Sequence, residues 1–250
     1  MFYKNNNSQE MYNRFLKTAN QSENIKLQKE FKAECNRLTL IAKKYLSDCQ
    51  DIYLHLNSHV VRKEYSSGGE LISRGFYCPS PIYDIVTGNC KRGKLLKRVT
   101  SRSKPTYEYC FDKNDNLIIV NHLNENSSEI LEYAGNSVIG ITFSKEVTPE
   151  ITSVIECKYD NYGRIISYIK AISSFNDCCI DQLEKEIYTY NDLGLFQAEV
   201  FDYLDNSDLG ILNFYKYTFE HDENGYLKEY KVENSIFEDD VYKINIKTKQ

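Results

Sequence analysis

Apolar residues recur at steps of three and four positions between residues 22 and 56, with no Gly or Pro among them. This spacing is typical of a helix with one apolar side. It predicts a single helix over about 22–56, which packs on the rest of the chain or on a second copy of itself. A shorter helix capped by Ser8 is predicted before it. The apolar stripe consists of Leu27, Phe31, Cys35, Leu38, Ala42, Tyr45, Cys49, Ile52 and Leu56.

From residue 59 the pattern changes to short alternating stretches separated by turn residues, which is typical of antiparallel strands. The first pair, 59–65 and 70–77, flanks the turn sequence Ser-Ser-Gly-Gly and predicts a hairpin. The sequence therefore predicts an α+β fold in which an N-terminal helical segment packs on an antiparallel β-meander of repeated hairpins. We expect helices over 1–58 and sheet over 59–250, within one continuous structural unit.

A local pattern recurs along the predicted sheet. An aromatic or similar residue is followed four positions later by Gly or Asp, and two positions after that by an apolar residue. The copies are Tyr65/Gly69/Leu71, Phe111/Asp115/Leu117, Tyr159/Gly163/Ile165, Tyr190/Gly194/Phe196 and His221/Gly225/Leu227, with a degenerate copy at Asn89/Gly93/Leu95.

Each copy predicts a hairpin turn. The Asp or Asn that often follows the aromatic residue accepts hydrogen bonds from the turn backbone. The Gly takes the left-handed conformation of a type I turn with a bulge. The last residue restarts the next strand facing the core. The predicted structural turn residues are Gly69, Gly163, Gly194 and Gly225.

Composition favours a sheet and a reducing compartment. The chain has 250 residues, with 21 Tyr and no Trp, and Tyr favours strands. The N-terminus has no long apolar run, so we expect no signal peptide, no membrane span and a cytoplasmic location. Eight Cys without a CxxC pair then favour reduced, partly buried thiols over a zinc site or disulfides.

Candidate chemistry is sparse. The sequence has no phosphate-binding glycine loop and no nucleophile elbow. His55 and His59 are spaced for one helical face but lack a third ligand, and Cys110 with His122 could meet across a hairpin. Structural roles are favoured for both pairs. We therefore predict no catalytic residue, no metal, no cofactor and no enzyme activity.

Charge is distributed unevenly. Residues 1–104 carry 19 Lys and Arg against 9 Asp and Glu, whereas residues 105–250 carry 12 against 27. The two halves either attract each other or form two binding faces. The densest basic run lies between Lys91 and Lys104. It could bind nucleic acid or an acidic protein, or it could be a solvated face or pair with charges inside the protein. Because the pI is about 5.5, the net negative charge of the chain argues against a nucleic-acid partner.

The acidic half offers a candidate partner surface. An inhibitor of a basic protein gains association rate from complementary charge. The alternative is a solvated acidic surface with no partner. The candidate partner-binding residues are Glu199, Asp202, Asp205, Asp208, Glu238, Asp239 and Asp240.

The segment Tyr159-Asp160-Asn161-Tyr162-Gly163-Arg164-Ile165 resembles the YD repeat of RHS and teneurin-type proteins. The segments starting at Tyr190 and His221 are weaker copies. The number of copies is too small for an RHS shell. Short proteins with such hairpins also resemble immunity proteins of bacterial polymorphic toxin systems. That resemblance implies a cytoplasmic protein that binds and neutralises a cognate toxin.

Three hypotheses follow from the sequence. The first is an immunity protein that binds one toxin, and the second is a repeat scaffold with another protein partner. The third is an enzyme whose site carries no recognisable motif. The identity of a neighbouring gene discriminates between them, because a toxin encoded next to this chain favours the first.

Overall fold

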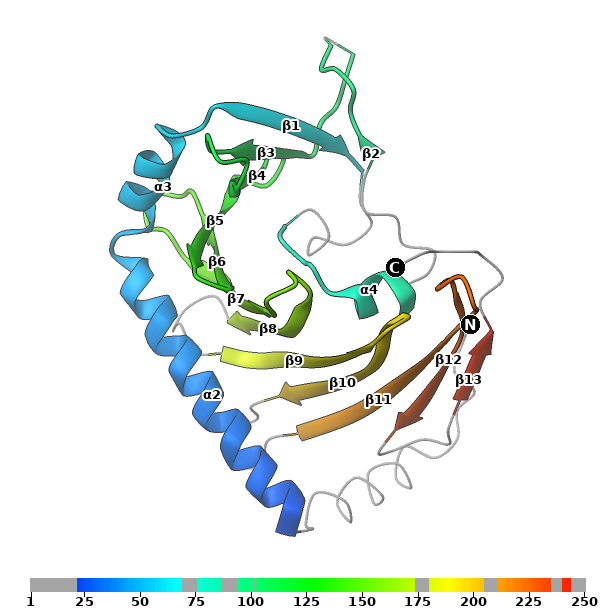
Figure 1. The fold of residues 1–250 in the computed structure, drawn as a ribbon. Coiled ribbons are helices and arrows are strands. Elements are labelled where there is room, and N and C mark those ends of the chain that lie inside the picture. Colours follow the sequence, from blue (N-terminus) through cyan, green and yellow to red (C-terminus); the bar gives the residue numbers. More distant parts are fainter. Residues whose placement is uncertain are drawn as a thin grey trace, which may run out of the picture. The chain divides into compact units, whose positions relative to one another are not determined.

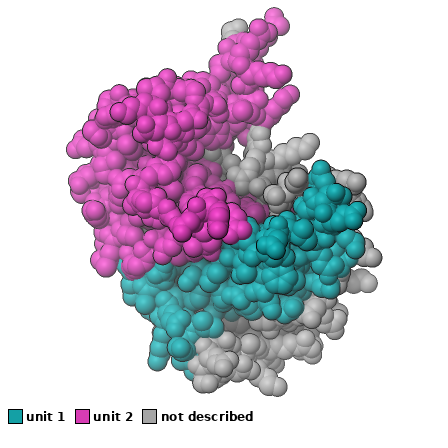
Figure 2. All heavy atoms as spheres, in the orientation of Figure 1, with its two compact units in different colours: residues 1–36, 181–250 teal, residues 37–180 magenta. Residues whose placement is uncertain are grey.

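The computed structural model describes most of the predicted helical segment and sheet. The described residues are 22–68, 76–86, 94–100, 102–173, 180–204, 211–234 and 240–243. The chain divides into two compact units, which Figure 2 colours separately. Unit 1 comprises residues 1–36 and 181–250, and unit 2 comprises residues 37–180.

The described part of the helical segment consists of two successive helices, α2 (Ser22–Leu46) and α3 (Cys49–Asn57) (Figure 1). The prediction of one unbroken helix is therefore wrong. The N–H of Asp48 donates to the carbonyl of Tyr45 at 3.1 Å, which is a tighter turn than the α-helix, and the Asp48 carbonyl then accepts from Ile52 at 2.8 Å. The predicted helix at Ser8 lies outside the described residues.

The predicted stripe is confirmed as the buried side of these helices. It stays buried across the break, from Leu38 through Tyr45 to Cys49. In unit 1 the Phe31 ring packs on Phe201, with ring centroids 5.4 Å apart. In unit 2 the Tyr45 hydroxyl donates a hydrogen bond to the carboxylate of Glu132, in the strand Ser127–Ala134. Each part of the stripe therefore packs against strands of its own unit.

Unit 2 contains an antiparallel sheet in the order β2-β1-β3-β4-β5-β6-β7-β8. A short helix, α4 (Pro81–Val86), lies between β1 and β2 in sequence. The strands are β1 (Arg62–Ser67), β2 (Lys94–Leu95), β3 (Tyr107–Phe111), β4 (Leu117–His122), β5 (Ser127–Ala134), β6 (Ser137–Ser144), β7 (Ile151–Tyr159) and β8 (Ile165–Ser173).

Unit 1 contains the remaining strands, each antiparallel to its neighbours in sequence. They are β9 (Ile180–Asn191), β10 (Gly194–Leu204), β11 (Ile211–His221), β12 (Leu227–Asn234) and β13 (Asp240–Lys243). The described chain is therefore an α+β protein with a β-meander. No helix among the described residues is both long and apolar enough to cross a membrane.

The first predicted hairpin is wrong where the structure describes it. Ser66 and Ser67, which were predicted to form the turn, belong to β1 and pair with Leu95 and Lys94 of β2. Residues 69–75 lie outside the described residues. Phe76 and Tyr77 are described and lie outside any strand. The prolines at 79 and 81 explain part of this, because proline cannot donate to a sheet ladder. Gly69 lies outside the described residues.

The turn between β7 and β8 has the predicted chemistry. The Oδ1 atom of Asp160 accepts the N–H groups of Tyr162 at 2.8 Å and Arg164 at 2.9 Å. Gly163 has a φ of +76° and donates its N–H to the Asp160 carbonyl at 3.0 Å. The register shifts by a bulge between Lys158 and Tyr159. This is the left-handed glycine turn that the sequence predicts.

Two other copies repeat this geometry. In the turn between β11 and β12, Asp222 accepts the N–H groups of Asn224 and Tyr226, and Gly225 has a φ of +78°. In the turn between β3 and β4, Asp112 accepts from two backbone N–H groups and Asp115 takes the left-handed position with a φ of +65°. A bulge accompanies each turn. The predicted turn is therefore a recurring unit of the sheet.

The copy at Tyr190 differs. Gly194 pairs directly with Asn191, so only two residues form the turn. The bulge then falls at Phe196, whose side chain is 41 % exposed, while Leu195 is buried. The prediction that Phe196 faces the core is wrong. Because this turn is shorter by one residue, Leu195 takes the core-facing position that was predicted for Phe196. Gly194 still has a positive φ, at +140°.

Replacing Gly163 tests the turn assignment. Nothing lies within 4 Å of a Cβ placed there, so a larger side chain meets no clash and only the backbone conformation is strained. We expect Gly163→Val to lower the free energy of unfolding by about 1 to 3 kcal/mol, measured by urea denaturation. Tyr162→Val is the matched control at an exposed neighbour and should cost less. Equal midpoints for both variants would contradict the assignment.

Candidate functional site

The candidate acidic surface is described only in part. Glu199 and Asp202 lie on β10, and the backbone of Asp240 begins β13. The other candidates are outside the described residues; they are Asp205, Asp208, Glu238 and Asp239. The partner-binding role of these residues stays a prediction.

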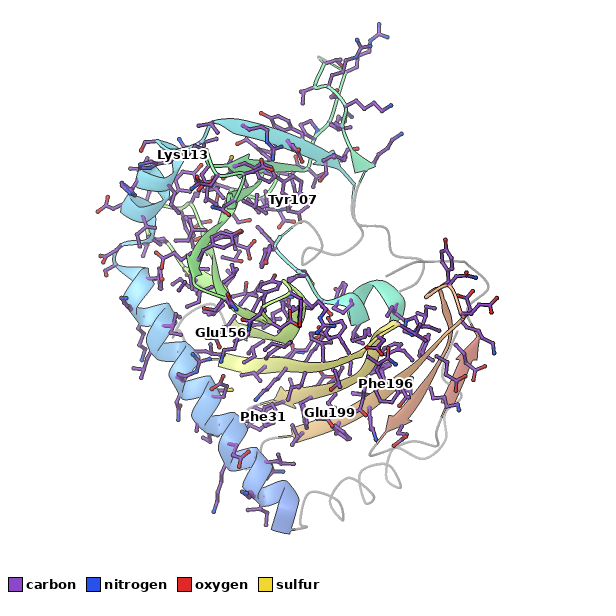
Figure 3. All side chains as sticks on the ribbon, viewed as in Figure 1. Phe31, Tyr107, Lys113, Glu156, Phe196 and Glu199 are labelled. Carbon is purple, nitrogen blue, oxygen red and sulfur yellow. The ribbon has the colours of Figure 1, made fainter. Side chains whose placement is uncertain are left out.

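Glu199 and Asp202 do not lie on the same face. They are three positions apart on one strand, and side chains alternate between the faces of a sheet. Phe201, on the Glu199 face, packs on Phe31 of α2, and Figure 3 labels Phe31 and Glu199. Asp202 therefore points to the face that α2 leaves uncovered. The two described acids cannot form one patch.

Asp202 has a different acidic neighbour. It lies directly opposite Glu184 of β9 in the antiparallel register, which brings the two side chains close together. Burial and, secondarily, the nearby Glu184 raise the pKa of Asp202 to about 6. Within the described residues neither carboxylate has an ion-pair partner. We call Asp202 and Glu184 the carboxylate pair.

A second group of polar side chains lies between α3 and the sheet of unit 2. Its centre is Asn121 on β4, which is 4 % exposed. The Asn121 Oδ1 atom accepts hydrogen bonds from Ser128 at 2.5 Å, Tyr53 at 3.2 Å and Lys145 at 3.3 Å. Its Nδ2 atom donates to Glu108 at 2.9 Å. We call these five residues the Asn121 network.

The pKa values of both charged members of the network are lowered, but for different reasons. Burial alone raises the pKa of Glu108, but hydrogen bonds from Tyr65, Lys63 and Asn121 outweigh it and hold the pKa below its usual value. Burial lowers the pKa of Lys145, against the opposing charge of Glu108. The Lys145 Nζ atom also lies 5.3 Å from the centre of the Tyr53 ring. The network thus holds a carboxylate and a half-buried amine beneath one helix.

The Cys110 and His122 pair does not form a nucleophilic site. Cys110 is fully buried on the α3 side, where burial raises its pKa to about 12. His122 follows Asn121 on β4 and so points to the other face, where its ring stacks on Tyr107 at 4.6 Å. A thiol with such a raised pKa is a poor nucleophile.

The His55 and His59 pair is held by the helix end. Their ring centroids are 4.6 Å apart, and the Nδ1 atom of His59 is 2.9 Å from the carbonyl oxygen of His55. In the part of the chain that the structure describes, no group of three acidic, His or Cys side chains is arranged to hold a metal ion. Of the basic run, Lys91 and Arg92 lie outside the described residues, and Lys94 is an exposed residue of β2.

Sequence reasoning did not find the Asn121 network or the pairing of Glu184 with Asp202. Asn121 directly follows the apolar run at 117–120, and this position was a signal for a buried polar group. Its partners come from four other segments, so the pattern of one strand could not identify them. The partner of Asp202 depends on the register between β9 and β10. No protein-family model matches the chain, and no curated protein matches it.

Asn121→Ala tests the network. It removes the acceptor shared by Ser128, Tyr53 and Lys145 and leaves buried polar atoms without partners. We expect the free energy of unfolding to fall by about 2 to 3 kcal/mol, measured by urea denaturation. Asn136→Ala, in an exposed turn, is the control and should have little effect. Similar losses for the two variants would show that the network contributes nothing beyond a surface amide.

Proposed function

We propose that this protein acts by binding another protein, without catalysing a reaction, and that its partner is a basic toxin which it neutralises. The observation that supports this is the carboxylate pair. Two acids face each other across neighbouring strands on the side of the unit 1 sheet opposite Phe31. Asp202 and Glu184 are both half-buried, so part of each side chain remains accessible.

The carboxylate pair lowers the stability of the protein when no partner is bound. Like charges directly opposite each other on a sheet are destabilising, and burial removes part of the water that would screen them. A Lys or Arg side chain from a partner neutralises the repulsion and forms charge-assisted hydrogen bonds to both acids. The planar guanidinium of Arg matches two carboxylate oxygens best. The pair therefore favours a basic partner over an acidic one.

The strands around the pair are held by buried aromatic side chains. Tyr217, Phe219 and Tyr230 pack together on β11 and β12 with ring centroids 6.2 to 6.3 Å apart. On the other side of the sheet, Phe31 packs on Phe201 and Tyr203. A preorganised surface loses little entropy when it binds. We propose that the N-terminal helices cover the meander for this purpose.

The repeated turns support a relationship with YD-repeat hairpins. Three turns share the same acceptor side chain, the same left-handed position and the same bulge. We propose that the hairpins arose from one repeated unit and that the protein is an immunity protein acting in the cytoplasm. The alternative is a repeat scaffold, which would use the same carboxylate pair to bind a partner that is not a toxin.

The variant Asp202→Asn should change stability and partner binding in opposite directions. The raised pKa means that the folded protein loses stability as pH rises from about 4 to about 6, where Asp202 ionises. The Asn variant avoids this loss. Its free energy of unfolding at pH 7 should therefore exceed that of the original chain by about 1 to 2 kcal/mol, allowing for screening at a half-buried site. Chemical denaturation at pH 4 and pH 7 measures both values.

The same variant should bind its partner less well. Binding is measured by calorimetry with the product of a toxin gene adjacent to this one. We expect Asp202→Asn to weaken the complex by at least about tenfold, because a charged hydrogen bond is lost. Glu199→Gln, on the opposite face, is the control and should bind normally. Loss of binding in Glu199→Gln alone would move the interface to the α2 face, and normal binding in both would exclude the acidic strand.

A further inference from the structure

A short segment of unit 2 crosses the face of its sheet that α3 does not cover. We call residues 76–80 the strap. Phe76 packs edge-on against Tyr107 and His122, with centroid distances of 5.5 Å and 6.3 Å. His122 points away from Asn121 and therefore away from α3. Cys78 and Ser80 of the strap are also buried, at 3 % and 0 % exposed.

Tyr77 of the strap makes two hydrogen bonds to the sheet. The Tyr77 hydroxyl forms a hydrogen bond with the Tyr159 hydroxyl of β7. The Tyr77 N–H donates to the Oε2 atom of Glu129, on β5, at 2.6 Å. Glu129 is 52 positions away in sequence, so this contact fixes the strap to the middle of the sheet. Residues 76–80, which include Pro79, are not part of any strand.

Glu129 is an unusual anchor because its carboxyl group is fully buried. Its Oε1 atom has no hydrogen-bond partner among the described residues. A Cβ atom on Gly140 of the adjacent strand would lie 3.0 Å from this oxygen. The carboxyl group thus rests against the bare backbone of Gly140, with no donor to compensate a negative charge on Oε1. Burying a charge in this way is unfavourable.

We infer that the strap stays on the sheet while Glu129 is protonated and is released when Glu129 ionises. Release admits water to the carboxylate, which the closed arrangement excludes. Burial raises the pKa of Glu129 to about 8, against the opposing effects of the Tyr77 N–H and Lys170. Because the closed form binds the proton more tightly than an open, hydrated form, rising pH must favour the open form.

Several ionisable groups share the face of the sheet that carries Glu129, and the Glu129→Gln variant keeps all of them. Burial raises the pKa of the neighbouring Tyr133 and Tyr159 to about 12, so both stay neutral when Glu129 ionises. Lys170 of β8 is the cation that acts on Glu129. The other ionisable groups on this face are Tyr107, His122 with its partner Glu125, and Cys157. Strand β6 contributes Gly140 and Thr142, which do not titrate.

The buried thiols provide a direct test on the full chain. Cys78 lies in the strap, whereas Cys110 is buried on the α3 side of the same unit. Iodoacetamide labelling of each Cys is followed by peptide mass spectrometry at pH 6.5 and pH 9, for the original chain and for Glu129→Gln. At pH 6.5, below the pKa of the closed form, the rates at which the two proteins label Cys78 should differ much less than at pH 9. At pH 9 the original chain should label Cys78 at least about tenfold faster than the variant.

The labelling rate of Cys110 is the control that distinguishes release of the strap from unfolding of the unit. Cys110 should react at the same rate in both proteins at each pH. Equal Cys78 rates at pH 9 would overturn the inference, as would a rise in Cys110 labelling that parallels Cys78. If Glu129→Gln does not fold, Glu129→Met takes its place with the same expectation. A constant ratio of Cys78 to Cys110 labelling across the two pH values in the original chain would overturn the inference without any variant.

Discussion

Each hairpin turn of this protein fixes the register of the two strands it joins, and register decides which side chains share a face. In three turns one Asp side chain accepts two backbone N–H groups, and a left-handed residue closes the turn. A slip of one residue would exchange the two faces of a strand. The meeting of Asp202 with Glu184 depends in the same way on the register of β9 and β10, which are joined by the two-residue turn between Asn191 and Gly194.

The buried polar groups differ in how many hydrogen-bond or ion-pair partners they have. Asn121 has partners for both its oxygen and its nitrogen, so it stabilises the contact between α3 and the sheet. The carboxylate pair and the Oε1 atom of Glu129 lack such partners among the described residues. Incompletely satisfied groups reduce stability, and they occur where proteins bind or change state. We therefore place the proposed binding and the proposed release at these groups.

The sequence predicts those features that depend on neighbouring residues. The apolar stripe and the turn at Gly163 are local patterns, and both are confirmed. The break at Asp48 interrupts a stripe whose spacing continues through it, so periodicity alone could not place it. The partners of Asn121 and Glu129 come from distant segments, such as Tyr77. Their meeting depends on the order of strands, which a single sequence does not specify.

The rate of association with the proposed partner, the basic toxin, at increasing salt concentration tests the central claim most directly. If the carboxylate pair recognises a basic partner, the rate constant should fall as ionic strength rises, because salt screens the attraction. The double variant Asp202→Asn with Glu184→Gln should lose most of that dependence while its unfolding remains cooperative. Stopped-flow fluorescence measures both. A rate that does not change with salt, or a double variant with unchanged salt dependence, would contradict the account.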